Sequence, residues 1–295
     1  MSDADKVIYF DIRKKIIANI TYEGWRKAPH VSYIYEADVT DFYNEFNKLN
    51  ASGQHQGHIP FNTLLLRVII EGIKAAPQLN AEIHFNPFLA SGRVVIKEKI
   101  NINMPILLPA GEMMTINLRD FGNKSLDSMT AQIEAITEKI KNGDTERSLM
   151  RVGVKDTFNH MRHGKFIKAL GRGLGAVIGS GKDKRIKSNA NVLSEALFDK
   201  GTITISNLGA AIRGTKGRIG MLDIIPPQVC VVGIGVLQEQ PSVFHNDDGA
   251  PQVGIRKIIP FTIVFDHRAL DFGEVAPFIH CLDSIFHNPK MIHSW

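Results

Sequence analysis

Helical and strand patterns alternate along the first third of the chain, and this alternation limits the possible folds more than any other feature. Isoleucines recur at helical spacing over 12–20, and Gly24 is a stop signal for that helix. Over 29–40, apolar and polar residues alternate as they do in a strand with one buried face. The sequence therefore predicts a protein that mixes helices and strands along one chain.

The same mixture continues to the C-terminus. We expect further helices over 41–50, 60–76, 125–143, 191–199 and 271–288. Thr40 is expected to cap the first of these and Pro77 to end the second. We expect strands over 93–97, 102–108, 112–118, 201–206, 229–237 and 257–265, with a turn at 245–251 between the last two. Neither a proline-rich linker nor a sustained repeat interrupts this series, so residues 1–295 are expected to form a single domain.

Positive charge is concentrated in one segment. The net charge is +5, yet the residues from Gly143 to Ala190 contain eleven Lys and Arg against four Asp and Glu. The basicity therefore belongs to this segment, and the protein as a whole is not expected to bind nucleic acid. We expect a basic helical insertion at about 144–190.

Composition excludes several classes of protein and site. Hydrophobic residues make up 44% and charged residues 22%, which is typical of folded proteins and excludes disorder. Because the sequence shows neither a signal peptide nor an apolar stretch of membrane-spanning length, we expect a cytoplasmic protein. Cys230 and Cys281 lie in apolar contexts and are expected to be buried free thiols. His160 and His163 lack further ligands at metal spacing, so no metal site is expected.

The segment 262–275 contains the strongest candidates for catalysis. A strand rich in β-branched and aromatic residues ends at Asp266 and His267, and Asp271 follows where the next helix begins. A histidine at a strand end can take a proton from a thiol or hydroxyl at neutral pH. The alternative is structural: Asp271 and Glu274 form a helix cap, and His267 is a hydrogen-bonded surface residue.

Ser206 is the second candidate. It ends the expected strand over 201–206 and precedes a glycine-containing loop, so its hydroxyl could donate to an oxyanion, although a plain turn serine would look the same. The glycines of 171–175 superficially resemble a phosphate-binding loop. They follow no strand and lack the spaced acidic partner, so we expect no nucleotide site there.

Motifs in a fixed order give the chain a family resemblance. ISNLG at 205–209, IIPPQVCVVGIG at 224–235 and PFTIVFDHRALD at 260–271 resemble the C-terminal catalytic domain of the dihydrolipoamide acyltransferases. Upstream segments agree in order, and the resemblance spans nearly the whole chain apart from roughly 145–195. It implies the chloramphenicol acetyltransferase-like fold, an α/β two-layer sandwich in which a mixed sheet packs against helices. It also implies a homotrimer or a multiple of trimers, with active sites between subunits.

The resemblance further assigns roles to residues. His267 matches the histidine that removes the proton from the attacking thiol, and Ser206 matches the hydroxyl that stabilises the tetrahedral oxyanion. Asp271 matches the acidic position that helps to fix the histidine, with Arg13 as its cationic partner. These matches imply an acyltransferase that moves an acyl group between dihydrolipoamide and coenzyme A, the latter entering as a substrate.

Two departures from the family pattern leave other interpretations open. Phe272 occupies a position that is usually glycine, and we expect no lipoyl or peripheral-subunit-binding domain in this chain. The lipoyl group would then be attached to a separate carrier protein. The basic segment could dock such a carrier, meet an anionic membrane face, or simply decorate the core. The alternative function is a catalytically weak trimeric scaffold or binding module of the same fold, and an acyltransferase for a non-lipoyl acceptor is a third interpretation.

Overall fold

The computed structural model describes residues 7–10, 12–107, 113–142, 199–209, 211–212, 214–245 and 248–295. The expected basic insertion at about 144–190 lies outside these residues, as does nearly all of the helix expected over 191–199. Among the described helices, none combines the length and apolar character that crossing a membrane requires.

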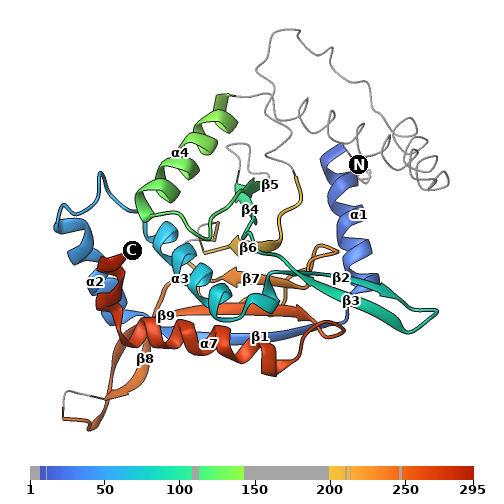
Figure 1. Ribbon diagram of the computed structural model, residues 1–295. Helices are drawn as coiled ribbons and strands as arrows, with labels where there is room; N and C mark the ends of the chain where they lie inside the picture. The colour runs from blue at the N-terminus through green and yellow to red at the C-terminus, as the bar shows by residue number, and fades with distance from the viewer. Residues whose placement is uncertain are drawn as a thin grey trace, which may run out of the picture.

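The described elements follow the expected alternation (Figure 1). The helices are α1 (Ile12–Lys27), α2 (Thr40–Ala51), α3 (Phe61–Ala75), α4 (Leu126–Asn142) and α7 (Phe272–His287), with 3₁₀ helices η1 (Pro77–Leu79) and η3 (Pro289–Ser294). The strands are β1 (His30–Asp38), β2 (Ala81–Asn86), β3 (Ser91–Ile96), β4 (Ile102–Leu107), β5 (Met113–Leu118), β6 (Ile203–Asn207), β7 (Cys230–Ile234), β8 (Gln238–His245) and β9 (Pro251–Asp266).

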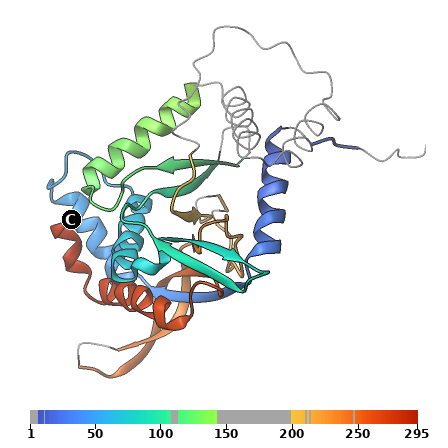
Figure 2. The ribbon, with the colours of Figure 1, turned by 45° about the vertical axis from the view of Figure 1, so that its right-hand side comes forward.

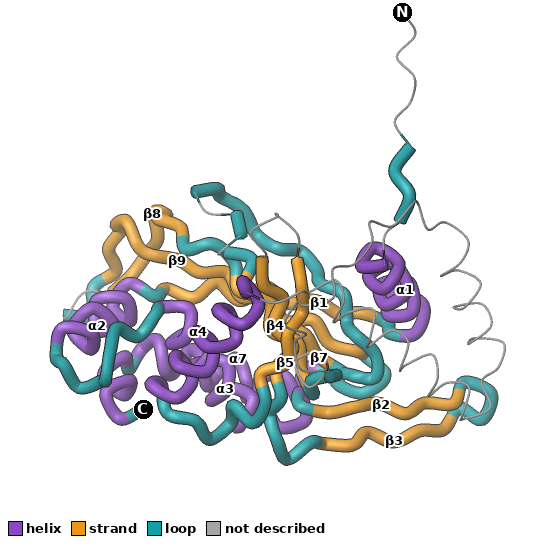
Figure 3. Tube along the Cα trace, turned by 90° about the horizontal axis from the view of Figure 1, so that it is seen from above, coloured by secondary structure: helices purple, strands orange, loops and turns teal. Residues whose placement is uncertain are grey.

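One mixed sheet forms the centre of the molecule. Its strand order is β1-β9-β7-β6-β4-β5, and β8 pairs with the first half of β9. β6 is parallel to β4 and β7, whereas β9 is antiparallel to β1, β7 and β8. β2 and β3 form a separate two-stranded arm that extends to one side (Figure 3). The expected α/β architecture, a mixed sheet packed against helices, is confirmed.

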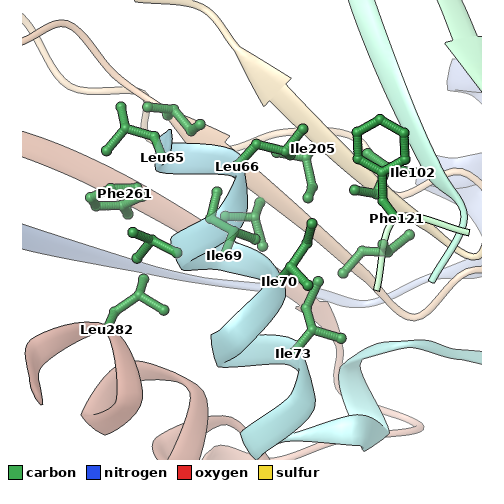
Figure 4. Close-up of a cluster of buried hydrophobic side chains, with 14 of the residues drawn as sticks. Leu65, Leu66, Ile69, Ile70, Ile73, Ile102, Phe121, Ile205, Phe261 and Leu282 are labelled. Atoms are coloured by element: carbon green, nitrogen blue, oxygen red, sulfur yellow. The ribbon is translucent and has the colours of Figure 1, made fainter. Parts of the chain in front are cut away.

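Helix α3 forms the centre of the core. It lies with α7 on one face of the sheet (Figure 2), and its apolar side chains meet those of β4, β6, β9 and α7. Figure 4 shows this cluster, which includes Leu65, Leu66, Ile69, Ile70, Ile73, Ile102, Phe121, Ile205, Phe261 and Leu282. Each such side chain contributes about 1.5–3 kcal/mol on burial, so α3 fixes the helical layer to the sheet.

Among the described residues, a smaller apolar cluster covers the opposite face of the central strands. Val231 of β7 and Val264 of β9 are buried there against Ala28, which follows α1, and Ile224 of the loop before β7. In Figure 1, α1 lies at one side of the molecule, away from α3 and α7. This face carries the polar side of β6, so its cover determines what can reach Ser206.

Three local expectations differ from the structure. Thr40 is not the N-cap of α2, because Val39 holds that position; the Thr40 hydroxyl instead donates to Asp38 Oδ1 at 2.6 Å. The strand β2 was not expected; it pairs with β3 in a small arm, and its first residues also bond to the segment before β7. The strand expected over 229–237 ends at Ile234, and the separate strand β8 forms the hairpin with β9.

The two cysteines differ in burial. Cys230 is fully buried in β7, as expected, whereas Cys281 in α7 is only partly covered. Burial raises the pKa of both thiols, and the nearby Glu71 adds to the rise at Cys281. Both groups are therefore protonated, weakly reactive thiols at neutral pH.

Candidate active site

The end of β9 presents His267 to solvent in a fixed orientation. Asp266 ends the strand, and the exposed His267 begins the turn that leads to α7. Its backbone N–H donates to the Pro29 carbonyl at 3.0 Å, and its ring Nδ1 lies 3.0 Å from the Leu270 carbonyl oxygen. Because a carbonyl oxygen can only accept, Nδ1 carries the proton. The neutral ring therefore has its lone pair on Nε2, where it can accept a proton from a substrate.

A buried ion pair stiffens the same turn. The Asp266 carboxylate, only 1% exposed, accepts from Arg268 Nε at 3.0 Å and from Arg268 Nη2 at 2.6 Å. It also accepts from the Arg268 backbone N–H. Because Asp266 and Arg268 flank His267 in sequence, this bidentate ion pair restricts the conformation of the turn.

Asp271 is the N-cap of α7. Its carboxylate accepts from the Gly273 backbone N–H at 2.9 Å, while its own N–H donates to Glu274 Oε2 at 3.0 Å. The two bonds form the capping box that sequence reasoning gave as the structural alternative. The Gly273 N–H holds the pKa of the Asp271 carboxyl below its ordinary value, with further contributions from Glu274 and His267. Asp271 is therefore an anion at neutral pH, one residue after the carbonyl that orients His267.

Ser206 is buried in β6, and within one chain it lies far from His267. It lies opposite Gly233 of β7, which lies opposite Thr262 of β9. His267 is five residues further along β9 and two strands away, a separation of roughly 19 Å from strand geometry. Because β6 and β9 run in opposite directions, their carboxyl ends lie at opposite ends of the sheet.

Arg13 lies in the first turn of α1, and its side chain is outside the described part of the structure. The helix places its backbone about 20 Å from Lys27, at the end of α1 remote from β1 (Figure 1). The bonds described for Asp271 go to α7 itself. The pairing of Arg13 with Asp271 stays a prediction.

Sequence reasoning missed His30, which lies opposite Asp266 in the pairing of β1 with β9. Its Nδ1 donates to the Ala28 carbonyl at 2.7 Å, and its Nε2 accepts from the Ile224 N–H at 3.0 Å. The ring thus fixes Pro29, whose carbonyl holds the His267 backbone. The available signal was a histidine at the start of the strand predicted over 29–40.

No group of three or more His, Cys, Asp and Glu side chains gathers at metal-binding distance among the residues that the structure describes. His160, His163 and the glycines of 171–175 lie outside those residues. The described part of the site consists of an oriented imidazole, that of His267, beside the N-terminus of α7.

Comparison with known proteins gives one family. The sequence profile of the family described as 2-oxoacid dehydrogenases acyltransferase (catalytic domain) matches residues 2–154 and 173–294. The lipoamide acyltransferase component of the branched-chain alpha-keto acid dehydrogenase complex of Pseudomonas aeruginosa is 22% identical over 292 residues, which is 98% of this chain and 53% of that protein. The chain thus spans about half the length of this relative.

Solved structures give the same fold. The dihydrolipoamide acetyltransferase of Azotobacter vinelandii, studied for the catalytic roles of a serine, a histidine and an asparagine, superposes with a TM-score of 0.66 at 18% identity, covering 98% of this chain and 94% of that one. The cubic core of a pyruvate dehydrogenase multienzyme complex gives a TM-score of 0.64 at 19% identity, with coverage of 98% and 94%.

Proposed function

Because the chain belongs to the family of 2-oxoacid dehydrogenase acyltransferase catalytic domains, we propose that it transfers an acyl group between the thiols of dihydrolipoamide and coenzyme A. The observation that carries this proposal is the tautomer of His267. Its Nδ1 proton is held by the Leu270 carbonyl, so the exposed ring offers Nε2 as a base.

In the proposed acyl transfer, His267 acts as the base. His267 Nε2 takes the proton from the incoming thiol, and the thiolate sulfur attacks the thioester carbonyl carbon. The Ser206 hydroxyl donates to the oxyanion that forms. When the intermediate collapses, the carbon–sulfur bond to the first thiol breaks, and the departing thiolate takes the proton back from His267. The imidazole ends unchanged, so the same base serves both directions.

The serine and the histidine of one active site come from two chains. Ser206 and His267 lie roughly 19 Å apart within a chain, too far for a single tetrahedral intermediate. The histidine and asparagine studied in the Azotobacter vinelandii enzyme are four residues apart, as His267 and Asp271 are here. The exposed apolar side chains of α1, among them Ile17 and Trp25, offer surface for a second copy. We assign the chain to a homotrimer or a multiple of trimers.

The partners and domains follow from the same assignment. Coenzyme A is a substrate, and a lipoyl group is the second thiol carrier, for which a separate lipoyl carrier protein is one source. Residues 1–295 form one catalytic domain with an insertion at about 144–190, and the family match itself breaks between 154 and 173. The excess of Lys and Arg in that insertion suits an acidic carrier.

Acyl transfer from acetyl-coenzyme A to dihydrolipoamide by the purified chain tests the function. We expect His267→Ala to lower kcat/KM on the order of 10²- to 10⁴-fold, the usual effect of removing a general base. His287→Ala, at the far end of α7, is the matched control and should be unchanged. A wild-type chain that forms trimers but transfers no acyl group would favour the scaffold, the alternative from the sequence.

A further inference from the structure

Two half-exposed aromatic rings lie beside the turn that carries His267. Phe272, the first residue of α7, packs edge-on against Phe265 with ring centroids 5.4 Å apart. It also meets Tyr33 of β1 edge-on at 6.1 Å. Phe272 is 50% exposed and Tyr33 is 40% exposed, so each keeps an open apolar surface. We call these two residues the aromatic shelf.

The shelf and the base share a rigid support. Phe265 is fully buried in β9, and the His267 ring packs edge-on against it at 5.9 Å. Because both rings rest on Phe265, the centroids of His267 and Phe272 are at most about 11 Å apart. Tyr33 is held by the pairing of β1 with β9, opposite Ile263. The N-terminus of α7 and the end of β9 lie on the same side of the molecule (Figure 1).

A single exposed aromatic ring needs no explanation, but two touching exposed rings, one of them within about 11 Å of a base, offer an apolar surface to a bound substrate. In transfer between two thiols, the acyl carbon lies next to the base in both directions. Each thiol attacks in one direction and leaves in the other, so each thiol arm is bonded to the acyl carbon for only part of the reaction. The acyl group is therefore the part of the substrate that a fixed wall beside His267 meets throughout the reaction.

Charge at the edge of the shelf limits which acyl groups fit. Asp271 directly precedes Phe272, and its carboxylate is ionised at neutral pH. The cation nearest in sequence, Arg268, is paired with Asp266 and lies over the Phe85 ring. A second carboxylate at the end of an acyl group would be repelled by the Asp271 carboxylate, and Arg268 is already paired with Asp266. A hydrocarbon chain would contact the rings of Phe272 and Tyr33 without this repulsion.

We propose, on the basis of the proposed function, that the aromatic shelf binds the hydrocarbon part of the acyl group. The chain then prefers branched or longer aliphatic acyl thioesters to acetyl thioesters, and it discriminates against dicarboxylic acyl groups such as succinyl. Phe272 and Tyr33 determine this specificity without taking part in proton transfer.

The first test is a substrate series. We expect kcat/KM for transfer to dihydrolipoamide to rise about fourfold for each methylene from acetyl- to propionyl- to isobutyryl-coenzyme A, with succinyl-coenzyme A the poorest donor. Phe272→Ala and Tyr33→Leu should reduce the increase in kcat/KM with acyl length, whereas Phe272→Leu should retain most of that increase. Phe88→Ala, which removes an exposed ring at the tip of the β2–β3 arm, should leave the series unchanged.

The second test measures binding without chemistry. Calorimetric Kd values for S-ethyl-, S-propyl- and S-isobutyl-coenzyme A should tighten along the series in the wild type, and Phe272→Ala should abolish this trend. If the wild type binds no thioether at all, the proposed function itself fails. Binding and transfer with no dependence on chain length would overturn the shelf alone.

Three further results would also overturn the shelf. In the first, Phe272→Ala accepts larger acyl groups better than the wild type, which would make the ring a barrier. In the second, Phe272→Ala alters use of dihydrolipoamide but not of dithiothreitol at every acyl length, which would assign the shelf to the thiol arm. In the third, Phe272→Ala only dissociates the oligomer in light scattering, which would make the rings a subunit contact.

Discussion

The orientation of His267 depends on backbone carbonyls more than on any acidic side chain. Leu270 fixes the ring tautomer and Pro29 holds the backbone, while Asp271 uses its carboxylate to cap α7. We therefore propose that Asp271 acts on His267 through the turn between them, as a positioning residue. This differs from a direct ion-pair or hydrogen-bond partner of the imidazole.

Two substitutions of Asp271 separate these roles. Asp271→Asn keeps a side-chain acceptor for the Gly273 N–H, so we expect kcat to stay within about tenfold of the wild type. Asp271→Ala removes the cap and shifts the turn, and a displaced base costs up to about 10²-fold in kcat. Steady-state kinetics with KM for each thiol measures both. Equal losses in the two variants would instead show that the negative charge itself is required.

A second carboxylate makes stability depend on pH. Asp127, at the start of α4, accepts from His55 Nδ1 at 3.0 Å and from the Gln56 N–H at 3.0 Å. The His55 bond holds the pKa of the Asp127 carboxyl below its ordinary value. A group with a lowered folded pKa stabilises the fold above its unfolded pKa, and this contribution is lost as pH falls through the folded value.

Asp127→Asn should therefore lower the free energy of unfolding at pH 7, and the difference from the wild type should shrink as pH falls from 5 toward 2. Urea unfolding at a series of pH values measures it. Asp248→Asn, at an exposed position between β8 and β9, is the control. A difference that is constant with pH would contradict the assigned bond.

At the scale of elements, the packing of α3 on α7 leaves no spare volume. A Cβ added to Gly72 of α3 would lie 2.5 Å from Leu282 Cδ1 and 2.7 Å from Phe278 Cδ2, both buried side chains of α7. Alanine gains about 1 kcal/mol of helix propensity over glycine, whereas overpacking a core costs about 1–3 kcal/mol. We expect the cost of overpacking to exceed the gain in helix propensity, because both α7 side chains are buried and cannot move into solvent.

We therefore expect Gly72→Ala to lower Tm despite its better helix propensity. Gly57→Ala is the matched control, since a Cβ there meets nothing within 4 Å. Thermal unfolding followed by circular dichroism compares the two. A stable Gly72→Ala variant would mean that α3 and α7 separate more easily than their packing indicates.

The same elements show what sequence patterns predict and what they miss. α3 and the second half of β9 were predictable, because a long apolar helix and a buried strand each leave a strong pattern. β8 was not, because its sequence QEQPSVFH is mostly polar and contains Pro241, which weakens a strand pattern. β2 was missed because its second half lies in an exposed arm with β3, so few of its residues show a buried pattern.

The candidate site was predictable as a set of residues but not as an arrangement. The residues alone left structural alternatives open, and the family resemblance, carried by the motifs at 205–209, 224–235 and 260–271, selected His267, Asp271 and Ser206. The distance between Ser206 and His267 depends on strand direction and register, which no local pattern encodes. His30 was missed because its role arises from contacts with Ile224, far away in sequence.

At the scale of the whole molecule, the antiparallel course of β6 and β9 determines how a complete site can form. Ser206 and His267 occupy opposite ends of the sheet in one chain, so the proposed site, which uses both residues, would take one of them from a neighbouring chain. In a cyclic trimer with head-to-tail contacts, each of three interfaces would join the His267 end of one chain to the Ser206 end of the next.

This arrangement predicts complementation between two inactive variants. In trimers formed at random from equal amounts of His267→Ala and Ser206→Ala chains, an interface is intact when an unaltered His267 meets an unaltered Ser206. That occurs at about one quarter of the interfaces in the whole mixture. Each mixed head-to-tail trimer has one such interface out of three, so the purified mixed trimers should recover about a third of the wild-type activity. Co-expression with two affinity tags and purification through both yields the mixed trimers, and mass measurement verifies their composition. Mixed trimers without activity would show that both residues act within one chain, which the separation along the sheet does not permit without a large rearrangement.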